Sequence, residues 1–441
     1  MWSSAELIVQ GRSLWEKYHG MNWKRTLFYA WLSQLLTQFG FSAVMPFIPL
    51  YIGQLLNTDN ERQIGLWVAL FYFFSLLSFC LVMPVWGRLS DQYGRRKMLI
   101  ISNFCNALLI PLMCLAPNVM MLVLIRSIAS ACGGMIILAQ SLVSAQTPNE
   151  RQGFALGILS TAEWGGLVLG FLLGGVVLDR FGFVTGFLIC GLMSALAGLM
   201  VYYVRDECNV RSATAKVPLS FWYIMATHYS LPSMEKIVVS TMLLFIGVQF
   251  LRNFDGPYVP MMVKTAFGTA NVAGKTGVIS AIACVGGMFS GLLAGWLCDR
   301  VPARLIIIPS LVVTALATAV QPLALTVAWF SAFRFLQGLS AGCLVSVLLT
   351  LISRNSRPEE RSTIFALASS SSTAAMALGT LCGGAIVATL GVPWTFYIPL
   401  LLYLLLIPLF RSLLFDNRGR KGGGKALHRL NRNRGYRGGF L

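Results

Sequence analysis

Two carboxylates, Glu163 and Asp255, lie well inside long apolar stretches, whereas the other fourteen acidic residues fall in polar segments or at the ends of apolar ones. A charged side chain at the centre of a membrane helix costs about 2.5–3.5 kcal/mol or more, so such residues usually have a function. A carboxyl group in apolar surroundings also holds its proton more readily than one in water. Glu163 and Asp255 are therefore candidates for binding and releasing protons. Alternatively, Asp255 neutralises Arg252, three residues before it.

Two arginines, Arg126 and Arg334, lie in apolar stretches 208 residues apart. Arg126 has no carboxylate nearby in its own stretch. We expect it to hydrogen-bond polar groups that recur at helical spacing in the first apolar stretch, namely Ser33, Gln34, Thr37 and Gln38. A purely structural anchor is the alternative for both arginines.

Amide side chains are sparse in the apolar stretches, and they are the candidates for lining a central cavity. We assign this role to four amides and one arginine: Gln34, Gln38, Gln249, Asn253 and Arg334. Aromatic and methionine side chains around them would suit amphipathic ligands of varied shape, because soft side chains repack easily. The alternative is that each amide links neighbouring helices. The run Ser369–Ser372 with Thr373 is interpreted as helix packing.

A polar segment, Gly87 to Arg96, follows the second apolar stretch, and a related one, Gly295 to Arg304, follows the eighth. Carboxylates beside several guanidinium groups can pair with them or with a helix N-terminus. Breaking such a pair costs a few kcal/mol, which is the scale that separates two conformations. We therefore predict a conformational latch, with solvated loop charges as the alternative, at Gly87, Asp91, Gly94, Arg95, Asp299 and Arg304.

Composition places these residues in a membrane. The 441-residue chain is 56% hydrophobic and 11% charged, whereas soluble domains are about a quarter charged. Spanning helices need about 20 apolar residues. Twelve stretches qualify, and the fold class is therefore an all-α membrane protein with these spans: 26–53, 64–87, 97–116, 119–146, 153–178, 183–204, 236–263, 272–297, 304–321, 325–352, 362–390 and 393–415.

The net charge of +18 reflects membrane topology. With the N-terminus inside, 27 Lys/Arg fall in cytoplasmic segments and four in outer loops: Arg62, Arg180, Lys264 and Lys275. This is the positive-inside bias. We therefore expect a multi-pass protein with both termini in the cytoplasm, in contact with the lipid bilayer and not with nucleic acid.

The chain repeats itself once. Gln38, Pro46 and Pro49 recur at Gln249, Pro257 and Pro260, an offset of 211, and Arg126 recurs at Arg334. Two copies of six spans have the same orientation and are related by an axis along the membrane normal. We predict a bundle at 1–205, a cytoplasmic linker at 206–235, a second bundle at 236–415 and a basic tail at 416–441.

These features resemble the major facilitator superfamily. The family's loop motif G-x-L-a-D-r-x-G-r-k is matched at Gly87, Leu89, Asp91, Gly94, Arg95 and Arg96. The first-helix pattern of twelve-helix drug/proton antiporters is matched at Gly40, Pro46 and Pro49. The antiporter motif of the fifth helix is matched, except that Phe171 replaces its proline, at Gly157, Gly166, Gly170, Gly174 and Gly175. The stretch from Ala43 to Tyr51 is most similar to the bacterial MdtG-type multidrug efflux branch.

The resemblance implies a proton-coupled secondary transporter of the bacterial inner membrane. It would export small amphipathic molecules by alternating access between two six-helix bundles. Glu163, Asp255 and Arg126 would couple transport to protons, and the fifth-helix glycines would take part in gating or in ordinary packing. The family often places a carboxylate in the first or fourth helix, and this chain has none there.

The remaining expectations concern alternatives and partners. A dedicated exporter or importer of one metabolite, such as a siderophore or sugar, is the second transport hypothesis. An enzyme is not expected, because no nucleophile–base pair or metal cluster is visible, and a non-transporting sensor is the remaining alternative. No cofactor or metal is expected, no phosphate-binding G-x-x-x-x-G-K-[ST] motif occurs, and we expect a monomer.

Overall fold

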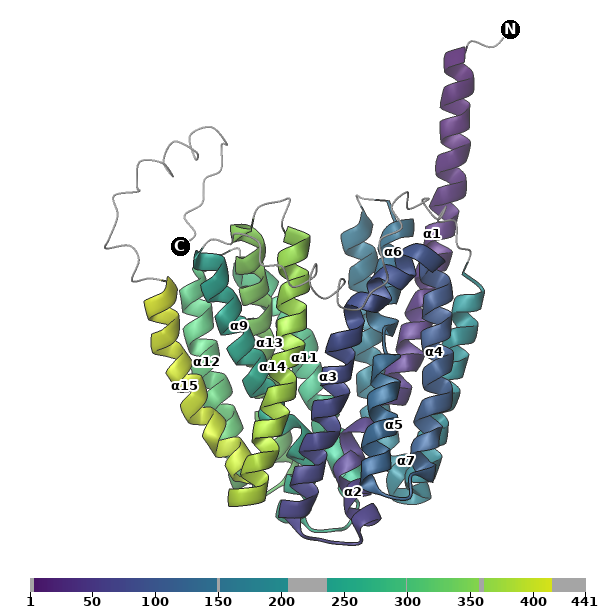
Figure 1. Ribbon diagram of the computed structural model, residues 1–441. Helices are drawn as coiled ribbons and strands as arrows, with labels where there is room; N and C mark the ends of the chain where they lie inside the picture. The colour runs from purple at the N-terminus through teal and green to yellow at the C-terminus, as the bar shows by residue number, and fades with distance from the viewer. Residues whose placement is uncertain (1–3, 149–150, 205–235, 299, 357–360, 415–441) are drawn as a thin grey trace. The chain divides into compact units, whose positions relative to one another are not determined.

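The computed structural model describes the backbone of residues 4–148, 151–204, 236–298, 300–356 and 361–414. Within these ranges, a few segments have no described side chains: 4–22, 91, 236–237, 292, 361–363, 366 and 409–414. The described residues form helices and no strand (Figure 1). The predicted all-α membrane fold is confirmed.

Ten helical segments of the described chain are long and apolar enough to cross a membrane. The longest, α7 (Gln152–Tyr202, 51 residues), contains non-helical backbone at Gly182, with φ 76° and ψ 177°. This φ suits glycine, which has no Cβ to clash. α7 therefore consists of two helices, in agreement with the predicted spans 153–178 and 183–204. The last helix, α15 (Trp394–Leu414), has a shorter apolar stretch, Trp394–Pro408. The count of twelve is thus reached only with α7 divided and α15 included.

Contacts between residues divide the chain into two units. The first unit comprises Met1–Asp59, Phe74–Thr227 and Thr269–Ala281. Its complete helices are α1 (Ser4–Ser42), η1 (Met45–Phe47), α2 (Ile48–Leu56), α4 (Arg95–Leu112), η2 (Met113–Leu115), α5 (Val119–Ala131), α6 (Met135–Gln146) and α7. One of its cores packs Trp23, Leu99, Leu142 and Leu159 together.

The second unit comprises Asn60–Phe73, His228–Gly268 and Ile282–Leu441. Its complete helices are α9 (Lys236–Asp255), η4 (Gly256–Tyr258), α10 (Val259–Phe267), α12 (Ala303–Val320), η5 (Gln321–Leu323), α13 (Val327–Asn355), α14 (Arg361–Leu390) and α15. Its core includes Phe245, Leu344, Leu348 and Tyr403.

Two helices contribute to both units. α3 (Glu61–Tyr93) has its first residues in the second unit, and α11 (Val272–Cys298) has its first residues in the first unit. The units therefore do not coincide with the predicted bundles 1–205 and 236–415, which differ from them by these two exchanged segments. The bundle boundaries stay a prediction.

The internal repeat is visible in the local structure of each half. Pro46 and Pro257 each lie in a short 3₁₀ segment, η1 and η4, that interrupts the first helix of its half. Proline lacks the backbone N–H that continues an α-helix and restricts the residue before it. Asn118 and Thr326, 208 residues apart, both cap a helix by accepting a hydrogen bond from the backbone N–H three residues later. Equivalent positions thus use the same local chemistry.

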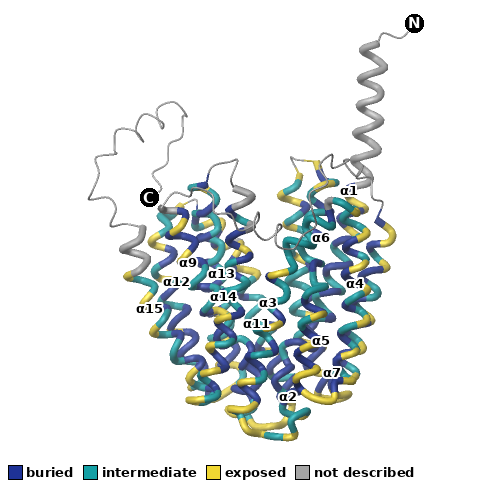
Figure 2. The backbone as a smooth tube through the Cα atoms, viewed as in Figure 1, coloured by how far each residue is buried: buried dark blue, intermediate teal, exposed yellow. Residues whose placement is uncertain are grey.

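The outer surfaces of both units are apolar. Large exposed side chains include Leu108 at 73% and Leu325 at 81% exposure. Figure 2 shows buried residues along the helix faces that pack within each unit and exposed residues on other faces of the same helices. Soluble proteins rarely expose large contiguous apolar patches, whereas lipid tails solvate them. The chain is a multi-pass membrane protein.

Candidate functional site

A buried ion pair joins Asp255, the last residue of α9, to Arg334 in α13. Asp255 is fully buried, and the Arg334 side chain is 13% exposed. The Arg334 guanidinium donates to Asp255 Oδ2. Asp255 is therefore paired with Arg334 and not with Arg252, which instead donates to Gln249 Oε1 at 3.3 Å.

Two glutamines complete the network around this pair. Gln337 Nε2 donates to Asp255 Oδ2 at 3.2 Å, and Arg334 Nη1 donates to Gln337 Oε1 at 2.8 Å. Gln321 Nε2 donates to the same Gln337 oxygen at 2.8 Å, and Gln321 Oε1 accepts from Arg334 at 3.2 Å. The other Asp255 oxygen, Oδ1, is buried and has no hydrogen-bond partner in the described chain. Removing one member of such a buried pair costs about 3–5 kcal/mol.

The equivalent positions of the first half are apolar. With the offsets of the repeat, Asp255, Gln321 and Gln337 correspond to Val44, Met113 and Ala129. Only the arginine is kept, as Arg126 in α5. It is buried and lies over the ring of Phe41 in α1, with 5.0 Å from Cζ to the ring centroid. Arg126 therefore contacts the first helix at an aromatic ring, an interaction worth about 2 kcal/mol when desolvated. Its expected hydrogen bonds to Ser33, Gln34, Thr37 and Gln38 stay a prediction.

Glu163 has a different environment from Asp255. It is half-buried in the middle of the first part of α7, and its Oε1 accepts a hydrogen bond at 3.2 Å from Gln140 of α6. Both residues belong to the first unit. No Lys or Arg of the described residues lies within ion-pairing distance of Glu163. The sequence singled out Glu163 by its depth, but Gln140 was missed because a lone amide in an apolar stretch carries no pattern.

The predicted cavity amides have unequal exposure. Gln34 is 1% exposed and donates from Nε2 to the Met135 backbone oxygen at 2.9 Å, so it links α1 to α6 as the alternative hypothesis describes. Gln38, Gln249 and Asn253 are half-buried. The serine and threonine hydroxyls of the run in α14 that have described bonds, Ser372 and Thr373, donate to the Ser369 backbone oxygen of their own helix.

Four of the five fifth-helix glycines lie at close helix contacts. A Cβ on Gly166 would lie 2.6 Å from the Leu35 oxygen of α1, and one on Gly175 would lie 2.5 Å from the Ala273 oxygen of α11. Gly170 and Gly174 also face the backbone of the α1 end. Gly157 has nothing within 4 Å. The glycine spacing therefore packs α7 against two helices of the first unit, while a role in gating stays a prediction.

The loop motif is described in part. Gly94 has φ 95° and precedes α4, so this turn requires glycine. Arg95 donates to the Ser141 oxygen at 2.8 Å, and Arg96 donates to the Tyr202 oxygen at the end of α7. In the second copy, Pro302 takes the position of Gly94 with φ −56°. The side chain of Asp91 and the whole of Asp299 lie outside the described residues, Gly87 has open space around it and Arg304 is exposed. The latch stays a prediction.

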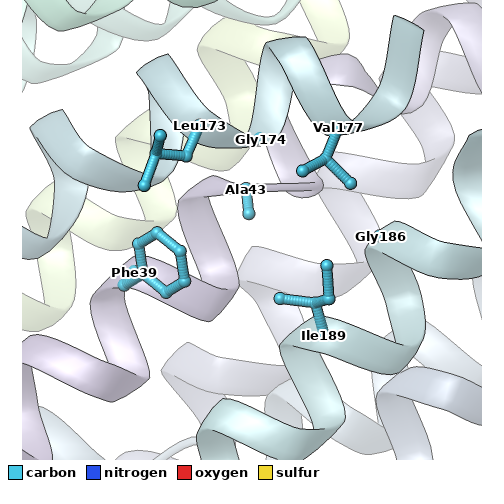
Figure 3. Close-up of a pocket in the computed structure, with 7 residues that line it drawn as sticks. All are labelled: Phe39, Ala43, Leu173, Gly174, Val177, Gly186 and Ile189. Atoms are coloured by element: carbon cyan, nitrogen blue, oxygen red, sulfur yellow. The ribbon is translucent and has the colours of Figure 1, made fainter. Parts of the chain in front are cut away.

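A small apolar pocket lies between the end of α1 and the two parts of α7 (Figure 3). Phe39 of α1 and Ala43, directly after the end of α1, face Leu173, Val177 and Ile189 of α7 across it, and Gly174 and Gly186 complete its wall. The lining has no polar surface. The pocket gives no group that could orient a polar ligand.

Comparisons with known proteins agree with this architecture. Residues 30–251 and 237–434 each match the family model described as Major Facilitator Superfamily. The chain is 30% identical over 372 residues to multidrug resistance protein MdtG of Salmonella choleraesuis (strain SC-B67), covering 84% of this chain and 91% of the relative. The protein of the same name from Dickeya zeae (strain Ech586) is also 30% identical, over 84% of this chain and 90% of its own length.

Solved structures share the fold at low sequence identity. The nucleoside transporter NupG matches with a TM-score of 0.71 and 12% identity, covering 88% of this chain and 99% of that chain. A bacterial homolog of the human lysosomal transporter Spinster, inward-facing and unoccupied, matches with a TM-score of 0.71 and 14% identity, covering 89% and 97%.

Proposed function

Because the chain belongs to the Major Facilitator Superfamily, we propose that it is a proton-coupled transporter that exports small amphipathic molecules across the bacterial inner membrane. The coarser conclusion, a secondary transporter that is not an enzyme, follows from the family. Export and a broad substrate range are supported by the relatives named multidrug resistance proteins, which are 30% identical over most of both chains.

The observation that carries proton coupling is the contrast between the two intramembrane carboxylates. Asp255 is held by Arg334 and Gln337 in a buried network of fixed partners. Glu163 is half-buried, with a hydrogen bond from neutral Gln140 and no cation within ion-pairing distance among the described residues. A carboxylate without a fixed counter-charge gains and loses a proton with less structural change. Glu163 is therefore the proposed proton carrier, and Gln140 its positioning residue.

In the proposed cycle, substrate enters from the cytoplasm while Glu163 is ionised. After the substrate leaves on the outer side, Glu163 takes a proton from the periplasm, the empty transporter returns, and Glu163 releases the proton to the cytoplasm. A charge at this depth is unfavourable when water is excluded, so protonation lowers the barrier to occlusion. Loop-motif residues around Asp91 and Asp299 would set the balance between the inward-open and outward-open conformations. We further propose that both termini are cytoplasmic and that the protein acts as a monomer.

A dedicated transporter of a single metabolite is the second candidate. The half-buried amides Gln38, Gln249 and Asn253 are the observation that favours it, because fixed amides can select one hydrogen-bonding pattern. The two candidates differ in how many dissimilar compounds exchange with protons.

The test uses everted membrane vesicles that carry the protein and an acidic lumen. We expect ethidium, tetraphenylphosphonium and chloramphenicol, added outside, to release lumenal protons, which is measured with a pH-sensitive acridine dye. Release with one compound class alone would favour the dedicated transporter, and no release with any compound would contradict proton antiport.

The variant E163Q is expected to abolish substrate-dependent proton release while substrate still binds to the purified protein. The matched control D416N neutralises a carboxylate of the C-terminal tail, outside every predicted span, and should release protons like the unmodified protein. Normal proton release by E163Q would remove Glu163 from the mechanism and shift the assignment to Asp255.

A further inference from the structure

Arg252 is a charged residue at the centre of a membrane span. The span Val238–Phe267 extends 14 residues before Arg252 and 15 residues after it. The side chain is exposed, and its described hydrogen bond is the one to Gln249 Oε1 at 3.3 Å. Ionisable residues at this depth almost always face a bundle interior or a water-filled cavity. The mechanism proposed above does not use this arginine.

The groups around Arg252 come mostly from other helices of the second unit. Four groups lie within electrostatic reach of the guanidinium: Asp255 of α9, Cys284 of α11, Arg334 of α13 and Tyr403 of α15. All four belong to the second unit. An exposed guanidinium at the centre of a span, with charged and polar groups of three other helices within electrostatic reach, fits a water-filled cavity better than contact with lipid.

Arg252 forms no ion pair with an acidic residue of the described chain, although Asp255 lies within electrostatic reach. Asp255 could have neutralised it, but its bonded oxygen is taken by Arg334 and Gln337. The Asp255–Arg334 pair is neutral as a whole, so this part of the second unit carries one net positive charge. At the equivalent position of the first half stands Phe41, an uncharged residue.

Two amide side chains lie next to Arg252 and form a polar face of α9 with it. Gln249, Arg252 and Asn253 are spaced by three and four residues, so they project from one side of α9. All three are at least partly exposed, whereas Leu251 and Phe254 on the opposite side are buried. A guanidinium offers several N–H donors in a planar fork that matches carboxylates and phosphates. The Gln249 amide nitrogen and the Asn253 amide add further donors.

We propose that this polar face of α9 is a binding site for the anionic group of the exported molecule, a carboxylate, sulfonate or phosphonate held by Arg252. This inference rests on the proposed function, because it names an anionic class of substrate for the same transporter, in addition to the cationic and neutral compounds of the vesicle test. An amphipathic anion would place its acidic group at Arg252 and its apolar part against aromatic side chains. Binding neutralises the charge of Arg252, so anions are preferred over cations of equal size.

The test measures binding to the purified full-length protein in detergent, by isothermal titration calorimetry. The probes are 1-naphthalenesulfonate, an aromatic anion, and tetraphenylphosphonium, an aromatic cation. We expect R252M, which keeps most of the side-chain length, to weaken naphthalenesulfonate binding tenfold or more. R252K should keep part of the affinity, because it retains the charge and loses the fork. Binding of tetraphenylphosphonium should be unchanged or tighter in R252M.

K264M is the matched control, because it removes a positive charge from the same span near its end. It should bind both probes like the unmodified protein, and gel filtration establishes that each variant is folded. The inference is overturned if the unmodified protein shows no saturable binding of naphthalenesulfonate, or if R252M binds it as tightly as the unmodified protein does.

Failure of the anion site and failure of proton antiport give different results. Proton release driven by tetraphenylphosphonium, without Arg252-dependent anion binding, would leave antiport intact and contradict the anion site. Arg252-dependent anion binding, without proton release by any compound in vesicles, would support the site and contradict antiport.

Discussion

Asp255 accepts hydrogen bonds from Arg334 and Gln337 at one carboxylate oxygen, and its other oxygen is buried without a hydrogen bond in the described part of the chain. An unsatisfied buried oxygen is costly, and the pair is retained despite that cost. Arg334 would otherwise be a nearly buried guanidinium beside two glutamine oxygens that cannot neutralise it. The buried polar interior of the second unit therefore consists of one charge pair and the amides that orient it.

The variant D255N should lower the stability of the folded protein by about 3–5 kcal/mol, because it leaves Arg334 buried without its counter-charge. R334Q should be destabilising for the converse reason. The double variant D255N/R334Q should recover most of the loss, since neither charge is then left alone. Thermal unfolding in detergent measures all three. Losses that simply add in the double variant would show that the pair is not the stabilising interaction.

In both units, glycines allow neighbouring helices to pack closely against each other. In the first unit, Gly166 faces the α1 backbone and Gly175 faces the start of α11. In the second unit, Gly379 and Gly383 face the backbone of α9, while Gly384 faces α3. Small residues let membrane helices approach closely enough for backbone contact. The same glycine pattern therefore packs one helix against the first helix of its half and against an exchanged segment from the other half.

Gly166→Ala should destabilise the first unit by about 1–3 kcal/mol, the range for overpacking, because the added Cβ would lie 2.6 Å from a backbone oxygen that cannot move aside. The matched control is Gly157→Ala in the same helix, where nothing lies within 4 Å. There the substitution should be neutral or slightly stabilising, because alanine favours helix. Thermal unfolding in detergent measures both. Equal melting temperatures for the two variants would contradict a packing role for Gly166.

The whole molecule combines a repeated scaffold with unequal polar interiors. Equivalent proline breaks and helix caps occur in both halves. The interior charges differ, since Glu163 with Gln140 lies in the first unit and the Asp255–Arg334 network and Arg252 lie in the second. A duplicated fold needs similar packing in both copies, but chemistry can be divided between them. This division supports separate sites for the proton and for the substrate anion.

The parallel repeat predicts that both copies of the loop motif lie on the cytoplasmic side of the membrane. Fusions of green fluorescent protein after Lys97 and after Arg304 should both fluoresce, because both loop-motif copies are expected in the cytoplasm. Alkaline phosphatase fused after Asp59 should be active in the periplasm. Fluorescence at only one of the two loop-motif positions would place the copies on opposite sides of the membrane and contradict the parallel repeat.

Much of the fold could be predicted because membrane insertion depends on local composition. A helix must satisfy its backbone hydrogen bonds internally in lipid, so an apolar stretch of sufficient length is sufficient to indicate a span. The predicted span 119–146 matches the segment Val119–Gln146, and 272–297 matches Val272–Cys298. The repeat was equally visible, because prolines and glycines act on the backbone at their own positions.

The partners of the charged side chains were decided only by the tertiary structure. Sequence proximity suggested Arg252 for Asp255, but the carboxylate meets Arg334, 79 residues away, where α9 and α13 pack together. Gln140, Gln321 and Gln337 acquire their importance in the same way, from contacts with side chains of other helices. Depth in the membrane is a property of one helix and can be derived from its residues, whereas an ion pair depends on how two helices pack and rotate against each other.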